Sequence, residues 1–588
     1  MEISTMPTLN WIGKDKVVNH HHDVPFRLLE REYSFKANEN TRGNTTNNKI
    51  IYGDNLESLK SLLPEFEGKI NCIYIDPPYN TGNQTWIYND SVNDPKINEW
   101  FGKTVGKEGE DLCRHDKWLC MMFPRLKLLH RLLADEGVIF ISIGNHEIHH
   151  LRMLVDEIFG YGNFIQNFIW ETHGHTENQE EISEVHEYVL CYSKKARHTP
   201  TTNFVVDENV EEDSKILRDF AENSITKNGD KNPHSVIELP VGFPCECKEV
   251  SFEADSYALD LLSAANNLGY ISKELTKAYE ASYPVKLDAA IILDGKLSNS
   301  CRVYSGWANA AKLKKFIQNQ CQPFDDKGTM MRFFLSKNGV IYYRREGRSQ
   351  KHIRSVLRNY GTVEKARNEL LNIGMDFPYP KPKELLQWLL SIYCTNDALI
   401  LDSFAGSGST AHAVLNLNAK DNGNRRFILC EMMEYAKSIT SERVRFVMNG
   451  YKEGNKYIQG TGGGFDFYKV GAPLFKADDN LNEDIGLNVI RDYVAYTENI
   501  PIQLRFDTNN TISSHALGST STALYIFYYE KERVTTLDID FLGSMKIKDL
   551  PSRPEQFVIY ADKCALDRDF LYNHNITFKR IPRDITRF

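Results

Sequence analysis

Two short segments of the sequence combine residue types that could carry chemistry. In the first, Asp76 and Tyr79 flank two consecutive prolines directly after the apolar run Ile70–Ile75. Because two prolines cannot occupy a helix interior or the centre of a strand, they fix a rigid, extended turn. A carboxylate and an aromatic ring held in this way suit a planar polar group such as a nucleobase amine. The alternative is a structural turn with an exposed tyrosine.

The second segment is a glycine turn that follows the strand-like run 398–402 and contains Phe404, Gly406 and Gly408. Glycines let the backbone approach a bound group closely, and the helix that follows offers free N–H donors. Neither GxxxxGK[ST] nor GxGxxG is present, so the turn alone is as consistent with a structural turn as with a cofactor loop. Glu431 ends the next strand, where a carboxylate can bind ribose hydroxyls or can simply be solvated.

The elements that must position these segments can be read from hydrophobic periodicity. Strands alternate with helices, which predicts an α/β fold with a doubly wound, mostly parallel sheet covered on both faces. Helices are expected at 56–63, closed by Pro64, at 118–133 and from 411. Strands are expected at 49–52, 70–75, 137–143, 163–170, 187–192, 398–402, 426–430, 465–470, 523–529 and 556–560.

The alternation lapses in a polar, mixed stretch and then resumes, so the α/β domain is expected in two sequence pieces with an insertion between them. The predicted domains are an N-terminal segment, two α/β halves around the insertion, and a C-terminal domain, at 1–47, 48–194, 195–375, 376–472 and 473–588.

The two motifs resemble those of a known enzyme family. Asp76-Pro-Pro-Tyr79 is similar to the catalytic tetrapeptide of amino-group DNA methyltransferases, and Phe404-x-Gly406-x-Gly408 is similar to their S-adenosylmethionine loop. The catalytic motif precedes the cofactor loop by over 300 residues, an order that resembles the circularly permuted β group. The segments 9–25 and 380–386 resemble the modification subunits of Type III restriction–modification systems.

This resemblance implies an S-adenosylmethionine-dependent methyltransferase fold, circularly permuted, with an inserted target recognition domain and a small C-terminal α+β domain. It implies methyl transfer to a flipped adenine N6 in double-stranded DNA, because cytosine-N4 enzymes usually carry Ser where this chain has Asp76. It further implies a homodimer formed through the C-terminal domain and a separate helicase–nuclease restriction subunit. Two alternatives stay open: a solitary DNA methyltransferase without a nuclease partner, and a non-catalytic DNA-binding protein with degenerate methylase motifs.

The resemblance also implies roles for individual residues. Asp76 and the carbonyl of Pro77 would hold the target amine, and Tyr79 would stack on the base. Lys381 lies in a run that would pack against the methionine end of the cofactor. The residues expected to bind the cofactor are Asp54, Lys383, Asp402, Phe404, Gly406, Gly408 and Glu431.

The net charge of −9 argues, on its face, against a nucleic-acid partner. The segment 312–358, however, holds twelve basic and three acidic residues, a net of +9, interleaved with aromatic residues inside the expected recognition domain. Since binding depends on the local field, this segment is expected to contact DNA. The candidate contacts are Arg344, Arg345, Arg348, Lys351 and Arg354.

Composition excludes other classes. Hydrophobic residues make up 41% and charged residues 25%, values of a globular protein rather than a disordered or fibrous one. The 11 cysteines include no CxxC pair, and His20–His22 are expected in a loop, so no metal site is predicted. No signal peptide or membrane-length apolar run is seen, so a cytoplasmic, nucleoid-associated location is expected.

Overall fold

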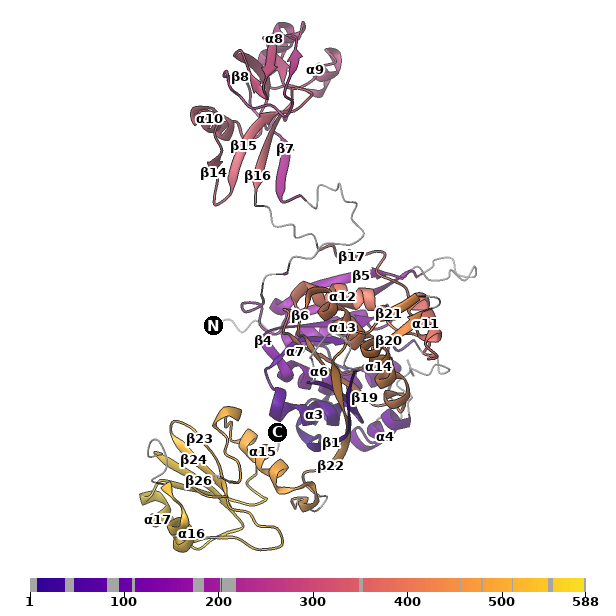
Figure 1. Ribbon diagram of the computed structural model, residues 1–588, viewed down its shortest axis with the longest axis vertical. Coiled ribbons are helices and arrows are strands. Elements are labelled where there is room, and N and C mark those ends of the chain that lie inside the picture. The colour runs from indigo at the N-terminus through magenta and orange to yellow at the C-terminus, as the bar shows by residue number, and fades with distance from the viewer. Residues whose placement is uncertain are drawn as a thin grey trace. The chain divides into compact units, whose positions relative to one another are not determined.

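In the computed structural model the chain forms two compact units (Figure 1). The larger unit comprises Met1–Asn203 and Arg354–Phe588, and the smaller comprises Phe204–Ile353. The smaller unit falls within the insertion expected at 195–375. The structure describes residues 8–37, 47–81, 95–107, 112–172, 184–200, 202–203, 218–347, 353–453, 456–476, 478, 480–509, 511–547 and 554–585.

A ten-stranded mixed sheet forms the centre of the larger unit. Its strands are largely buried, as expected for a sheet with helices on its faces (Figure 1). In spatial order they are β1 (Arg27–Lys36), β22 (Gly464–Pro473), β2 (Asn48–Tyr52), β19 (Arg426–Glu431), β18 (Leu399–Asp402), β3 (Ile70–Ile75), β4 (Leu133–Ile143), β6 (His186–Ser193), β5 (Phe164–Glu171) and β17 (Val356–Leu357).

The sheet interleaves two distant parts of the sequence. Strands β19 and β18 insert between β2 and β3, and β18 pairs in parallel with β3 through the partners Leu401 and Ile73. From β18 the chain proceeds to β19 on one side, whereas from β3 it proceeds to β4 on the other. The β18–β3 boundary is therefore a topological switch point, where open α/β sheets bind ligands at the carboxyl ends of their strands.

Helices pack against this sheet. Asp54 starts α3 by accepting hydrogen bonds from the backbone N–H groups of Leu56 (2.8 Å) and Glu57 (3.2 Å). Pro64 does not close α3 as expected but lies inside its last turn, because the buried Leu63 and Phe66 hold that turn against the core. The helices are α1 (Lys14–Val17), α2 (His20–Asp23), α3 (Asn55–Phe66), α4 (Pro95–Thr104), α6 (Arg114–Leu132), α7 (Ile148–Phe159), α11 (Val363–Asn372), α12 (Lys383–Tyr393), α13 (Ser409–Asp421) and α14 (Ser441–Asn449).

The N-terminal segment contributes an ordered strand to the sheet. Strand β1 pairs antiparallel with β22, which itself runs parallel to β2. Aromatic rings fix this edge, because Tyr33 stacks on Phe467 with ring centroids 5.0 Å apart. His20 in α2 accepts a hydrogen bond from the indole of Trp100 (3.0 Å). Hydrophobic periodicity did not indicate β1, because its side chains are only partly buried.

The smaller unit is an independent α+β fold with its own apolar cores. It contains antiparallel sheets in the orders β14-β15-β16-β7, β10-β13-β8 and β12-β11-β9. Its elements are β7 (Phe220–Ser224), β8 (His234–Leu239), β9 (Val250–Phe252), α8 (Ala258–Leu268), α9 (Lys273–Ala278), β10 (Val285–Lys286), β11 (Ala290–Leu293), β12 (Lys296–Leu297), β13 (Cys301–Gly306), α10 (Ala310–Gln318), β14 (Phe324–Asp325), β15 (Met330–Leu335) and β16 (Ile341–Glu346).

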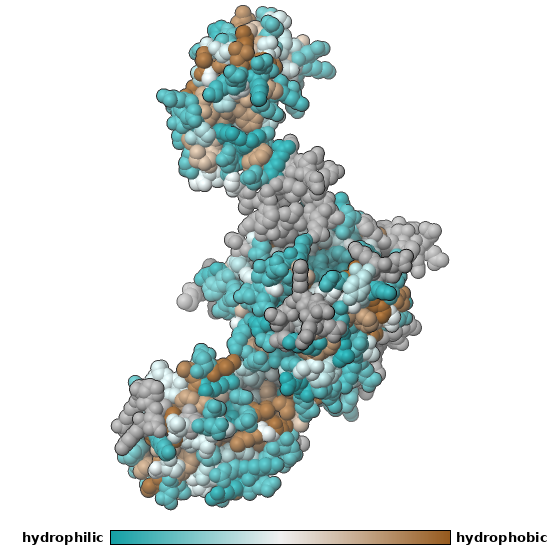
Figure 2. Space-filling model, viewed as in Figure 1, coloured by the Kyte–Doolittle hydropathy of each residue, from teal (hydrophilic) through white to brown (hydrophobic). Residues whose placement is uncertain are grey.

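The C-terminal part of the larger unit forms a four-stranded sheet with its own buried residues. Its strands and helices, in chain order, are α15 (Leu487–Thr497), β23 (Ala516–Ser519), β24 (Ala523–Phe527), α16 (Ile539–Ser544), β26 (Gln556–Ala561), α17 (Arg568–Asn573) and β28 (Ile576–Arg580). The visible faces of the molecule are mostly hydrophilic with scattered apolar residues (Figure 2). Among the described residues, no helix is both long and apolar enough to cross a membrane.

Candidate active site

A cavity of about 250 Å³ opens in the larger unit among the residues that follow β3 and β18. The fold brings the two sequence motifs together at this point, because β3 and β18 are adjacent and parallel and therefore end at the same edge of the sheet. Six of the predicted site residues line the cavity: Asp76, Pro77, Tyr79, Asp402, Phe404 and Gly406.

A lysine lies between two carboxylates at the catalytic turn. The Nζ atom of Lys381 is 2.9 Å from Oδ2 of Asp76 and 3.5 Å from Oε2 of Glu187. The same ammonium lies 4.7 Å from the centre of the Tyr79 ring, at a cation–π distance. Because the Lys381 side chain is only 8% exposed, water screens these interactions weakly. The cation thus compensates two carboxylates that would otherwise repel each other in a poorly hydrated site.

The ring of Tyr79 is fixed on several sides. Its hydroxyl donates a hydrogen bond to Oε2 of Glu187 (2.7 Å). Burial, reinforced by the negative charge of Asp76, raises the pKa of Tyr79 well above its usual value, so the hydroxyl stays protonated. A Cβ atom placed on Gly144, directly after β4, would lie only 2.9 Å from Cδ2 of Tyr79. The glycine therefore makes room for the ring.

The turn that carries Asp76 and Tyr79 is held from behind by two helices. The indole N–H of Trp118, in α6, donates to the carbonyl of Pro78 (2.7 Å). Asn80 has a left-handed backbone (φ 59°) and donates to the carbonyl of Arg114 (3.2 Å) and to the carboxylate of Glu147. Asn is one of the few residues that tolerate this conformation, so both the backbone and the contacts of Asn80 fix the turn.

The glycine turn after β18 depends on the absence of side chains. Gly406 and Gly408 both have positive φ angles, 51° and 81°. The backbone N–H of Gly406 donates to Oε2 of Glu431 (2.8 Å), and its carbonyl accepts from the hydroxyl of Thr440 (2.6 Å). A Cβ atom on Gly408 would come within 3.3 Å of the Thr440 carbonyl. The turn therefore keeps its backbone close to the neighbouring segment and open to the cavity.

Two buried carboxyl groups flank this turn. Asp402 accepts hydrogen bonds from the N–H of Phe404 (3.0 Å) and the hydroxyl of Thr410 (2.5 Å). Burial raises the pKa of Asp402 to about 7, and it likewise raises the pKa of Glu431 to about 7. Each group therefore gains from a positively charged ligand nearby, because such a ligand favours the ionised carboxylate.

This donor set fits S-adenosylmethionine, which carries a sulfonium and an ammonium. The carboxylate of Asp402 suits such a positive group, the aromatic ring of Phe404 suits an apolar or planar part, and the glycine backbone that lines the cavity allows close approach. Glu431 lies behind Gly406 and can accept hydrogen bonds from ribose hydroxyls at the end of β19. When bound, the cofactor supplies an electrophilic methyl group.

Four residues expected at the cofactor do not line the cavity: Glu431, which lies behind Gly406, and Asp54, Lys383 and Gly408. Asp54 uses its carboxylate to cap α3. Lys383 forms an ion pair with Glu369 on α11, whereas Lys381 is the lysine that reaches the cavity. Gly408 contributes through the shape of the turn, next to Thr440.

The candidate DNA contacts lie partly on the smaller unit. Arg344, on β16, pairs with Glu222 (2.7 Å) and stacks over the Phe220 ring (4.0 Å). Arg345 pairs with Asp326. Arg354 is exposed, whereas Arg348 and Lys351 lie outside the described residues.

Sequence reasoning missed Glu187, Asn80 and Glu147. Strand β6 runs antiparallel to β4, so its first residues lie at the edge where β3 and β4 end. A parallel strand would have placed Glu187 at the opposite edge, and this is why its position next to Tyr79 was not expected. The signal that could have found Asn80 is its position directly after a rigid turn, where Asn favours a left-handed backbone.

Comparison with known proteins identifies the class. Residues 70–303 and 306–442 match the family described as DNA methylase. The matched residues make up more than half of the chain. The chain belongs to this family of DNA methyltransferases, and its methyl donor is S-adenosylmethionine. The predicted α/β methyltransferase fold is confirmed.

Among its relatives are the Mod subunits of two Type III restriction–modification enzymes. The chain is 26% identical to StyLTI Mod of Salmonella typhimurium, over 84% of this chain and 72% of that protein. It is 31% identical to EcoPI Mod of Escherichia phage P1, over 73% and 64%. It is also 30% identical to the Type II methyltransferase M.KpnI of Klebsiella pneumoniae, over 66% of this chain and 81% of that protein.

Proposed function

We propose that the protein is a DNA adenine-N6 methyltransferase and the modification subunit of a Type III restriction–modification system. The observation that carries the methyl-transfer proposal is the single cavity lined by both Asp76–Tyr79 and the Asp402–Gly406 turn. An Asp at the first position of the tetrapeptide favours adenine over cytosine N4. The likeness to two Type III Mod subunits supports the system assigned.

In the proposed reaction the chain positions a flipped adenine and its amine. The lone pair of that amine is delocalised into the purine ring, so the amine is a weak nucleophile. Asp76 and the carbonyl of Pro77 accept hydrogen bonds from it, localise the lone pair and stabilise the positive charge that develops. Tyr79 stacks on the base and offsets part of the stacking lost on flipping. Lys381, now beside Asp76, must yield that carboxylate to the amine.

The test is methylation of duplex DNA with labelled S-adenosylmethionine, followed by digestion to nucleosides and mass spectrometry. We expect N6-methyladenine; N4-methylcytosine would contradict the adenine assignment. Asp76→Asn should lower the rate by at least about 100-fold, because a transition-state acceptor is replaced by a poorer one. Its affinity for the cofactor, measured by calorimetry, should change little. Wild-type turnover in this variant would remove Asp76 from the catalytic role.

We further propose that the inserted unit selects the DNA sequence, with the basic residues of 312–358 on DNA phosphates and bases. Its separate fold and its position between the two motifs support this role. Sequencing that detects methylated bases, applied to DNA from cells expressing the protein, would give the recognition site. Methylation without any sequence preference would contradict the proposal.

The partner distinguishes the Type III system from a second candidate, a solitary methyltransferase. The likeness to M.KpnI, of which the chain covers 81%, shows that chains of this kind include methyltransferases that are not Type III Mod subunits. Co-purification of the tagged chain from its native host decides between them. A helicase–nuclease that purifies with it supports the Type III assignment, and its absence in a host that encodes one supports the solitary enzyme.

We propose that the C-terminal part, 473–588, mediates homodimerisation, as its position in Type III modification subunits suggests. Light scattering should give twice the mass of one chain for the full protein. A variant ending at Ala472 should be monomeric. If the full protein is already monomeric, or the shortened variant stays dimeric, this assignment is wrong.

A further inference from the structure

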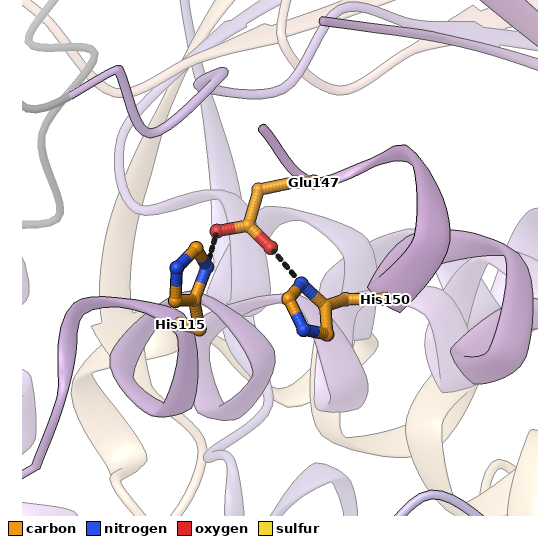
Figure 3. A group of neighbouring side chains, drawn as sticks. All are labelled: His115, Glu147 and His150. Carbon is orange, nitrogen blue, oxygen red and sulfur yellow. Dashed lines mark hydrogen bonds and ion pairs between the residues drawn. The ribbon is translucent and has the colours of Figure 1, made fainter. Parts of the chain in front are cut away.

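Two histidines and a glutamate from two helices converge behind the catalytic turn. His115 lies in the first turn of α6, Glu147 directly precedes α7, and His150 lies in the first turn of α7. The Nδ1 atom of His115 is 2.7 Å from Oε1 of Glu147, and that of His150 is 2.8 Å from Oε2 (Figure 3). None of the three lines the cavity at Asp76.

Glu147 is an acidic side chain in a buried position. The Glu147 side chain is fully buried, and a buried carboxylate is costly unless a cation compensates it. Within the described part of the chain, the only basic side chains within ion-pair distance of Glu147 are the two imidazoles. Imidazole nitrogens are the commonest metal ligands in proteins. A metal ion held between the three groups would place positive charge next to the buried carboxylate.

The ligand atoms are arranged for such an ion. One donor atom from each of His115, Glu147 and His150 lies within 4.8 Å of the others. Both imidazoles present Nδ1 to the same carboxylate, from its two sides (Figure 3). The two histidine side chains are 37% and 36% exposed, which leaves a solvent side where water can complete the coordination. Two nitrogen donors and a carboxylate suit zinc and its neighbours rather than magnesium or calcium.

We propose that His115, Glu147 and His150 form a binding site for one divalent transition-metal ion of the zinc class. The site is structural, because Glu147 also accepts a hydrogen bond from Asn80, the residue after Tyr79. A bound metal ion would fix the carboxylate of Glu147, and the hydrogen bond from Asn80 would be an outer-shell contact that orients this ligand. Through Asn80 it stiffens the turn that carries Asp76 and Tyr79. The proposal concerns binding and does not depend on the proposed DNA target.

The direct test is calorimetric titration of chelator-treated protein with Zn²⁺. We expect one ion per chain and a higher unfolding temperature in its presence, since a ligand that binds only the folded state stabilises it. His150→Ala and His115→Ala should each weaken binding by at least about 10-fold. His149→Ala is the matched control, because His149 is an exposed residue on the same helix, and it should bind as the wild type does.

Two outcomes would overturn the proposal. One is the lack of stoichiometric binding by the wild-type protein. The other is unchanged affinity in both histidine variants, which would place the ion elsewhere. If either variant fails to fold, X-ray absorption of the wild-type protein loaded with zinc replaces it. That spectrum should show histidine nitrogen ligands, and a shell of oxygen alone would contradict the site.

Discussion

At the scale of single residues, the site is an arrangement of compensated charges. Lys381 contacts the carboxylates of Asp76 and Glu187 and the ring of Tyr79 at once. It therefore fixes the relative positions of the Asp76 carboxylate and the Tyr79 ring, to which we assign the amine contact and the stacking on the base. Such preorganisation matters because small displacements of reacting groups reduce rates strongly.

Lys381→Met should slow methyl transfer about 10- to 100-fold, because Asp76 and Glu187 lose their shared cation and move apart. Single-turnover rates at saturating DNA and cofactor measure this effect. Lys365→Met is the control, because Lys365 is an exposed lysine that pairs with Glu384 at 3.6 Å. A wild-type rate for Lys381→Met would show that the cation does not position the site.

Glu431 should make folding stability depend on pH. Its pKa is raised from 4.5 to about 7 by burial, so the folded chain holds a proton that the unfolded chain has lost between these values. The free energy of unfolding therefore falls as pH rises from about 4.5 to 7. Glu431→Gln should reduce that fall by about 3 kcal/mol. Denaturant unfolding between pH 5 and 8 measures it, with the exposed Glu434→Gln as control. If the free energy of unfolding changes equally with pH in the wild type, Glu431→Gln and Glu434→Gln, burial does not raise the pKa of Glu431.

At the scale of elements, strand ends decide which groups meet. Asp76 follows β3, Gly144 follows β4, and Glu187 is the second residue of the antiparallel β6, so all three reach one edge of the sheet. The same edge receives the turn after β18. The strand order therefore assembles the site, and the loops supply its side chains.

Gly144→Ala should slow methyl transfer about 10-fold or more, because the new methyl group would lie 2.9 Å from Tyr79 and must displace its ring. Cofactor affinity should stay near the wild-type value, since the added methyl group contacts Tyr79, the ring that we propose stacks on the base. Gly162→Ala is the matched control, because its added Cβ meets nothing within 4 Å. The two variants are compared in rate and in calorimetric affinity. Equal rates would mean that Tyr79 tolerates the shift.

At the scale of the whole molecule, charge is distributed unevenly between parts. The basic segment 312–358 lies largely on the smaller unit, but part of its charge is used internally. Arg344 pairs with Glu222 from outside the segment, and Lys312 and Arg345 share Asp326. The positive field offered to DNA is therefore smaller than the sequence count of +9 indicates. Exposed residues such as Arg354 are better candidates for phosphate contacts than the paired arginines.

Arg354→Ala should weaken DNA binding uniformly across sequences and reduce the salt slope by about 1, as the loss of one phosphate contact does. Fluorescence anisotropy with duplex DNA between 50 and 200 mM salt, a range that resolves such slopes, is the measurement. Lys273→Ala, an exposed change on α9, should leave the slope unchanged. The assignment fails if Arg354→Ala binds with the wild-type slope.

Local patterns predicted the elements that carry the chemistry. The run Ile70–Ile75 is β3 as expected, and Arg426–Glu431 is β19, because apolar strands of a parallel sheet are continuous and unmistakable. The partly buried β1 was not predicted, and no strand or helix was assigned within the inserted domain, since neither shows this pattern. Pro64 was expected to end α3 and does not, because tertiary packing outweighs the loss of one hydrogen bond.

The sequence by itself determined the chemistry: a rigid turn with Asp76 and Tyr79, a glycine turn at Gly406, and the family to which both belong. These features are local, because backbone conformation and residue type suffice to define them. Only the tertiary structure decided that Lys381 and Glu187 join Asp76 and Tyr79. These positions result from the pairing of β18 with β3 and from the reversed direction of β6. Both depend on contacts between residues far apart in the chain.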